Sequence, residues 1–166
     1  MSDCATTTPP TCAVIAPVGA ETARQAKAAL FREVCDAHGW RAILPALDDT
    51  VADALTLATI ASAELVIADL SHERPSCYFE LGYAVALGKP VVLVAGAGTP
   101  LHYTDPDHRP IFYESQPALR AIVAAALDAQ DAKQGRSLSL PSLSMAPTPD
   151  GSTPPRPAFV SDKETV

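Results

Sequence analysis

The chain has 166 residues, of which 48% are hydrophobic, 19% charged and 5% aromatic. This length and composition suit one folded domain with a modest extension, and they exclude a chain that is disordered throughout. The formal net charge of −7 at pH 7 argues against a protein that binds nucleic acid by neutralising phosphates with a basic face.

The sequence carries no signal for export, membrane insertion or metal binding. Its first residues lack the basic and apolar segments of a signal peptide, and no apolar run approaches the roughly 18 residues of a membrane helix. The four cysteines include no Cys-x-x-Cys pair, and the four histidines match no zinc spacing. We therefore expect a cytoplasmic protein with buried, reduced thiols that binds no membrane, metal or cofactor.

Short β-branched runs alternate with longer stretches rich in Ala and Leu over the first 130 residues. The apolar runs predict strands at 12–17, 41–45, 64–68, 89–94 and 110–113. The stretches between them carry apolar residues at helical spacing and predict helices at 21–38, 50–63, 76–87 and 117–129. Gly39 and Gly88 are the expected C-terminal stops of the first and third helices.

This alternation predicts an α/β fold in which right-handed helical crossovers connect parallel strands. We expect a flavodoxin-like, doubly wound, five-stranded parallel sheet in the order 2-1-3-4-5, with helices on both faces. In that order the chain reverses direction across the sheet between the first and third strands. A ligand should therefore lie over their carboxyl ends, at residues 17–20 and 69–80.

The composition changes near residue 131. Residues 131–166 are rich in Ser and Pro, hold six of the sixteen prolines, and contain four acidic and four basic residues. We therefore predict a flexible N-terminus over residues 1–11, a folded domain over 12–130 and a disordered tail over 131–166.

The segment from Asp69 to Glu80 brings ionisable groups to the predicted ligand site. With Ser76 as the N-cap of the third helix, Glu80 lies in the first turn, where free N–H groups and the helix dipole favour an ionised carboxylate. This placement suits a nucleophile, and the alternative is a glutamate that only complements the dipole. Asp69 either assists catalysis, by orienting a ligand hydroxyl or protonating a leaving base, or caps the loop.

Further residues near these carboxylates are candidates for substrate binding. The turn that contains Pro17 and Gly19 offers backbone amides to an anion, and Arg24 is placed to pair with a phosphate or to remain solvated. Ser71 and Ser76 are short donors for a sugar or phosphate, and the alternative role of each is a helix or turn cap.

Residues 66–94, VIADLSHERPSCYFELGYAVALGKPVVLV, resemble the core signature of the nucleoside 2-deoxyribosyltransferase-like superfamily. This superfamily includes deoxynucleoside monophosphate N-glycosidases and is related to TIR domains. The E-L-G-x-A segment that begins at Glu80 is the specific part of the signature. CAVIAPVG at 12–19 and RPIFYESQPALRAIVAAAL at 109–127 are also similar, so the resemblance covers most of the predicted domain.

The resemblance implies an enzyme that cleaves the N-glycosidic bond of a nucleoside or nucleoside 5′-monophosphate. It implies that Glu80 attacks the anomeric carbon, and that water or a second base resolves the glycosyl ester. It also implies a small-molecule partner and a homodimer, because some members complete the active site of a neighbouring subunit. Arg74, with Arg24, is the candidate for holding a 5′-phosphate.

The sequence departs from the family pattern at two places. Thr56 stands near the position of an aspartate that many members carry on the helix before the third strand, and the nearest acid is Asp53. Arg74-Pro75 stands where related sequences often have Asn-Pro. Two alternatives therefore remain open: a TIR-like NAD glycohydrolase, and a nucleotide-binding sensor without catalytic activity.

Overall fold

The computed structural model of the chain describes residues 8–16, 21–44, 54–102, 105 and 107–136, with the backbone alone for residues 21–24. Within these ranges the strands are β1 (Thr11–Ile15), β2 (Arg41–Ile43), β3 (Leu65–Asp69), β4 (Val91–Gly96) and β5 (Ile111–Tyr113). The helices are α1 (Glu21–Ala37), α2 (Ala54–Ser62), α3 (Pro75–Ala86) and α4 (Gln116–Lys133).

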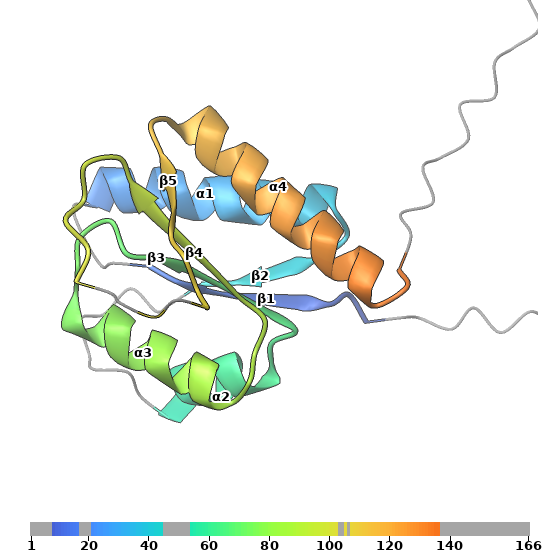
Figure 1. The fold of residues 1–166 in the computed structure, drawn as a ribbon. Helices are drawn as coiled ribbons and strands as arrows, with labels where there is room; N and C mark the ends of the chain where they lie inside the picture. Colours follow the sequence, from blue (N-terminus) through green and yellow to red (C-terminus); the bar gives the residue numbers. More distant parts are fainter. Residues whose placement is uncertain (1–7, 17–20, 45–53, 103–104, 106, 137–166) are drawn as a thin grey trace, which may run out of the picture.

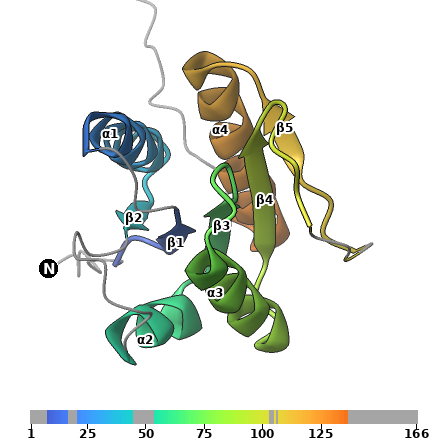
Figure 2. The same ribbon diagram turned by 90° about the vertical axis from the view of Figure 1, so that its left-hand side faces the viewer.

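The strands form one parallel sheet in the order β2-β1-β3-β4-β5. Helices α1 and α4 cover one face of this sheet and α2 and α3 cover the other (Figure 1). The view in Figure 2 shows the two helix pairs separated by the strands. These observations confirm the predicted flavodoxin-like topology, which follows from short connections and right-handed crossovers.

The side chains of β3 alternate between two apolar clusters. Leu65 and Ile67 pack in the cluster beneath α1 and α4, whereas Val66 and Ala68 pack in the cluster beneath α2 and α3. Because successive side chains of a strand point to opposite faces of the sheet, Asp69 follows Ile67 and faces α1 and α4. Every residue of β3 is buried, as expected for a central parallel strand.

Most expected element ends lie within two residues of the observed ends. Gly39 and Gly88 have φ of +72° and +66°, which confirms the two expected helix stops. Strand β1 begins at Thr11, and the carbonyl of Pro10 accepts a 2.8 Å hydrogen bond from the amide of Arg41. The sheet therefore starts one residue before the expected boundary at 12. Residues 1–7, 17–20 and 45–53 lie outside the described part of the chain.

The C-terminal boundary of the domain is further along the chain than expected. Helix α4 continues to Lys133, so the predicted start of a disordered tail at residue 131 is wrong. Asp131 is only 6% exposed and accepts a 3.1 Å hydrogen bond from the indole nitrogen of Trp40. Arg136 donates to the other oxygen of Asp131 at 2.9 Å. Residues 131–136 thus belong to the folded domain, and residues 137–166 lie outside the description.

Arg136 adds two more contacts to this corner of the fold. Its guanidinium binds Glu64 at 2.7 Å and lies over the ring of Trp40, 4.8 Å from the centroid. The Pro- and Ser-rich composition that follows hides these contacts in the sequence, because they join residues about 70 to 100 positions apart.

We expect the Asp131→Ala variant to be destabilised by roughly 2–3 kcal/mol, because it leaves the buried Trp40 N–H without its acceptor. This corresponds to a fall in Tm on the order of 10 °C. Asp128→Ala is the matched control, because Asp128 lies on the same helix but is 56% exposed. Thermal unfolding followed by circular dichroism measures both, and equal Tm values for the two variants would contradict the contribution assigned to Asp131.

Candidate functional site

Glu80 lies in the second turn of α3. The helix begins at Pro75, and Arg74 is its N-cap, without a hydrogen bond from its side chain. Pro suits the first helical position because its φ is fixed and it has no N–H that needs a partner. Ser76 is therefore the second residue of the helix. Its expected role as N-cap is wrong, and so is the expected first-turn position of Glu80.

The Glu80 carboxylate is in apolar surroundings. The residue is 8% exposed, and no described residue donates a hydrogen bond to its side chain. Burial raises the pKa of Glu80 above the ordinary glutamate value, because removal from water disfavours the charged form. The expectation that the helix dipole favours the ionised form of Glu80 is therefore not met, because desolvation raises the pKa of this carboxylate.

Glu80 lines a cavity of about 270 Å³ between the sheet and α2 and α3. The carboxyl-terminal parts of β1 and β2 form one wall, α2 forms another, and Leu55, which is 71% exposed, is part of the lining. The lining residues are Ala13, Val14, Ile15, Ile43, Leu44, Leu55, Thr56, Thr59, Ile60 and Glu80. Among these described residues, Glu80 is the only ionisable one, and Thr56 and Thr59 add hydroxyl groups.

The cavity coincides with only part of the expected ligand site: it includes the end of β1 and, from residues 69–80, Glu80, but its other strand residues come from β2 and not from β3. Pro17 and Gly19 follow β1, but they lie outside the described residues. Arg24 lies within α1, and its side chain is likewise outside the description. Arg74 and Ser76 are exposed at the start of α3.

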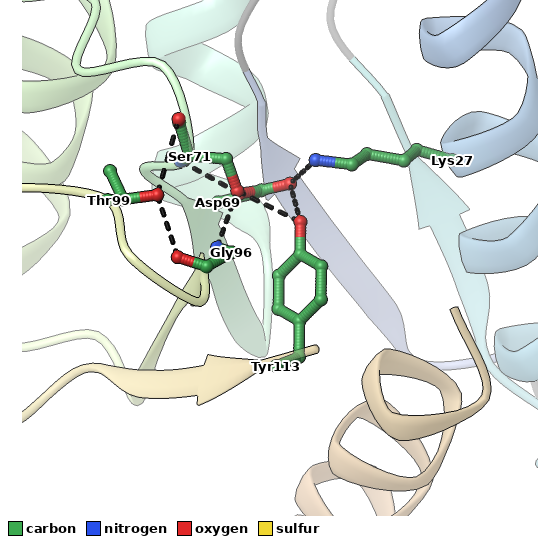
Figure 3. Close-up of polar contacts among 6 residues, drawn as sticks. All are labelled: Lys27, Asp69, Ser71, Gly96, Thr99 and Tyr113. Atoms are coloured by element: carbon green, nitrogen blue, oxygen red, sulfur yellow. Dashed lines mark hydrogen bonds and ion pairs between the residues drawn. The ribbon is translucent and has the colours of Figure 1, made fainter. Parts of the chain in front are cut away.

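Asp69 is placed differently from Glu80. Its side chain is fully buried at the end of β3, on the sheet face that α1 and α4 cover. Lys27 of α1 donates to Asp69 Oδ2 at 2.6 Å, and the hydroxyl of Tyr113 donates to the same oxygen at 3.2 Å (Figure 3). The backbone amide of Ser71 donates to Oδ1 at 3.0 Å, and its hydroxyl donates to the same atom.

Ser71 extends this cluster to the neighbouring strand. Its Oγ accepts a 2.9 Å hydrogen bond from the amide of Gly96 at the end of β4, and it lies 2.9 Å from the hydroxyl of Tyr113. Thr99 Oγ1 donates to the carbonyl of Gly96 at 2.7 Å (Figure 3). The structure thus joins Asp69 and Ser71 to each other. Neither is among the residues that line the cavity with Glu80.

A second polar cluster holds the next part of the same loop. Glu73 has φ of +46°, a left-handed conformation that costs a non-glycine residue about 1–2 kcal/mol. Its Oε1 accepts hydrogen bonds of 2.9 Å from the Tyr78 hydroxyl and from the backbone amide of His102. Desolvation acts to raise the pKa of Glu73, but the hydrogen bonds from Tyr78 and His102 outweigh it and lower the pKa overall.

Sequence reasoning missed Lys27 and Tyr113. Lys27 precedes Leu30, Phe31 and Val34 by three, four and seven residues, which places a charge on the apolar stripe of α1. A lysine on the apolar stripe of a helix needs a buried partner, so the position of Lys27 in the sequence already indicates a buried ion pair. Tyr113 ends β5, where its place at the carboxyl edge of the sheet was a weaker signal.

Two further features of the described residues bear on the site. They contain no group of three or more His, Cys, Asp or Glu side chains that could hold a metal ion. In the same ranges, no helix combines the length and apolarity needed to cross a membrane.

Comparison with solved structures shows the same fold in proteins of low sequence identity. A CMP N-glycosidase, BcmB, from Clostridium botulinum superposes with a TM-score of 0.52 at 18% identity, covering 69% of this chain and 98% of that one. A response regulator receiver domain protein from Bacillus halodurans superposes with a TM-score of 0.51 at 13% identity, covering 74% of this chain and 97% of that one.

No curated protein shows a significant sequence match to the chain. The family model for nucleoside 2-deoxyribosyltransferase matches residues 16–111. This region is more than half of the chain, and it contains both the E-L-G-x-A segment and the α2 wall of the cavity. The chain therefore belongs to the nucleoside 2-deoxyribosyltransferase family.

Proposed function

We propose that this protein cleaves the N-glycosidic bond of a nucleoside or nucleoside 5′-monophosphate, with Glu80 as the nucleophile. The observation that carries the proposal is the position of Glu80: a buried carboxylate in the wall of a cavity of about 270 Å³. Membership of the nucleoside 2-deoxyribosyltransferase family supports the type of bond. The size of the cavity is close to the lower end of small-ligand pockets, which begin at about 300 Å³.

The chemistry follows from the surroundings of this carboxylate. A Glu80 oxygen forms a bond to the anomeric carbon while the carbon–nitrogen bond breaks and the base leaves with the electron pair. Positive charge develops on the sugar in the transition state. A carboxylate that burial has destabilised interacts strongly with that charge, because the apolar walls screen it little. Water or a second base then attacks the anomeric carbon and releases Glu80.

Exposed groups at the start of α3 support a phosphate on the substrate. Arg74 and Ser76 are both exposed there, and a guanidinium and a hydroxyl are suitable donors to phosphate oxygens. We include Arg24, Pro17 and Gly19 in this proposal on sequence grounds alone. Asp69 has an indirect role in this proposal, because it is buried and does not line the cavity.

One feature of the cavity favours a second candidate, an NAD glycohydrolase. Among the described lining residues, only Glu80 carries an acidic group, so none of the others there protonates a leaving base. Nicotinamide leaves NAD as a neutral base and needs no proton from the protein. NAD therefore belongs in the set of substrates tested.

The sequence also predicts a homodimer and a cytoplasmic location, and both stay predictions. Light scattering of the purified protein measures the oligomeric state directly.

Base release tests the nucleophilic role of Glu80 directly. We expect wild-type protein to release free base from one class among nucleosides, their 5′-monophosphates including CMP, and NAD, as measured by liquid chromatography. The Glu80→Gln variant should be slower by about 10³-fold or more, because an amide is a poor nucleophile. Glu33→Gln is the matched control at an exposed glutamate of α1. Undiminished release by Glu80→Gln would refute the nucleophile. If thermal shift shows that the wild type binds one of these compounds but no base is released, the alternative of a nucleotide-binding sensor without catalytic activity would be favoured.

The pH dependence of the reaction tests the ionisation of Glu80. Attack requires ionised Glu80, and the ionised fraction decreases as the pH falls through the pKa of that group. Because burial raises this pKa, we expect kcat/KM to fall on the acidic side with a midpoint above 4.5, the ordinary value for glutamate. Stopped assays between pH 4 and 8 measure it, and a midpoint at or below 4.5 would contradict a buried nucleophile.

The burial of Glu80 also affects the stability of the folded protein. The folded state holds the proton of Glu80 more tightly than the unfolded state, so this group contributes stability at low pH that is lost as the pH rises through its folded pKa. At neutral pH we therefore expect Glu80→Gln to have a higher Tm than the wild type, because the substitution removes the buried charge. The gain should shrink at acidic pH. A lower Tm for Glu80→Gln than for Glu33→Gln would oppose this interpretation.

A further inference from the structure

The carboxylate of Asp69 has no capacity left for a ligand. Its Oδ1 accepts from the amide and hydroxyl of Ser71, and its Oδ2 accepts from Lys27 and Tyr113. An ionised carboxylate offers about four acceptor positions, and these four donors fill them. The residue is fully buried and is not part of the cavity lining. Asp69 therefore does not touch a substrate in the cavity.

The same carboxylate fixes the segment that leads to Glu80. Ser71 is the second residue after β3, and its hydroxyl is held between Asp69 and the amide of Gly96. The amide of Leu70 donates to the carbonyl of Val94 at 2.9 Å. The start of the loop is thus bonded to the end of β4 through one backbone and one side-chain contact.

The end of the loop is held as well. Glu73 keeps its left-handed conformation against hydrogen bonds from Tyr78 and His102, and Pro75 begins α3 two residues later. A strained conformation of this kind persists only where the surrounding contacts determine it. Since α3 is a continuous helix, the position of its first residue sets the position of Glu80.

Lys27 supplies the charge that keeps the Asp69 carboxylate compensated. Its amine is 2.6 Å from Asp69 and 5.4 Å from the ring centroid of Tyr113. Desolvation acts to lower the pKa of Lys27, and the contact with Asp69 outweighs it, so that the pKa lies above the ordinary lysine value. Lys27 thus remains a cation at neutral pH, and the ion pair is complete.

We propose that Asp69 is a positioning residue: paired with Lys27 and Tyr113, it holds Ser71 and thereby orients the loop from Leu70 to Arg74 that places Glu80 in the cavity. This inference rests on the proposed function of Glu80. It assigns Asp69 an action through another residue, in place of direct contact with the leaving base.

The first test separates positioning from proton donation. Ser71→Ala removes one oxygen from the cluster, and Ser62→Ala is its control at an exposed serine that ends α2. The assay uses the best substrate among the nucleosides, 5′-monophosphates and NAD tested, at a temperature well below Tm. We expect Ser71→Ala to lower kcat by about 10- to 100-fold. KM should stay within about threefold of the wild-type value. Unchanged kcat in Ser71→Ala would overturn the proposal.

Asp69→Asn gives the complementary result. We compare a substrate with an uncharged base with nicotinamide riboside and 7-methylguanosine, whose bases are positively charged in the substrate and leave as neutral molecules without taking a proton. A positioning residue causes a similar fold-loss on both kinds of substrate. If Asp69→Asn slows only the substrate with a neutral base, and the cationic bases are released at the wild-type rate, Asp69 is a proton donor and the proposal is wrong.

A second measurement does not depend on activity, and it covers the case in which Asp69→Asn folds poorly or the wild type releases no base. Amide hydrogen exchange of Ser71→Ala is compared with that of Ser62→Ala. We expect faster exchange at Gly96 and from Leu70 through Glu80, because the loop and the first turns of α3 loosen together. Faster exchange confined to Gly96 would overturn the positioning role. Absence of base release by the wild type bears on the proposed function instead, and hydrogen exchange then decides the positioning role by itself.

Discussion

The carboxyl edge of the sheet depends on one buried carboxylate, that of Asp69. Parallel strands end at this edge without a hairpin to join them, and side-chain contacts there add to the backbone pairing of the strand ends. Asp69 ends the central strand and binds donors from α1, from β5 and from the loop before α3. Burying a carboxylate is costly unless a cation and several donors compensate it, and here Lys27, Tyr113 and Ser71 do so. These contacts fix the first residues of the loop between β3 and α3, the helix that carries Glu80.

The two carboxylates of the site are in opposite environments because of strand alternation. Asp69 faces α1 and α4 and is bonded on every side, whereas Glu80 lies on α3, across the sheet, with no hydrogen bond from a described residue. Full hydrogen bonding fixes a carboxylate in place and occupies its lone pairs. Lack of it leaves the lone pairs free and the charge destabilised. Carboxylates in such different environments have different roles, and we accordingly propose support for the bonded one and attack for the unbonded one.

The fold could be predicted from the sequence because each strand is an apolar run and each helix has an apolar stripe, so local pattern and topology agree. Glu80 could be found from its motif. Its turn in the helix could not, because Ser76 and Pro75 both suit the start of α3 and the proline took the first helical position. The sheet face to which Asp69 points could be predicted, because Asp69 lies two and four residues after Ile67 and Leu65 and such side chains share a face of a strand. The pairing of Asp69 with Lys27, 42 residues away, could not be predicted, because only the folded chain brings the two residues together.

The function proposed for this chain rests on its site and its family, and not on its fold. A glycosidase and a response regulator superpose on it almost equally well, with TM-scores of 0.52 and 0.51, so the doubly wound sheet alone does not choose between such activities. In the described part of this chain, Glu80 on α3 lies in the wall of a cavity, and no described residue donates a hydrogen bond to its carboxylate. A group of this kind costs stability, and a protein retains such a cost where the charge is needed. In the proposed cleavage of an N-glycosidic bond, the negative charge of Glu80 is needed because positive charge develops on the sugar carbon as the base departs.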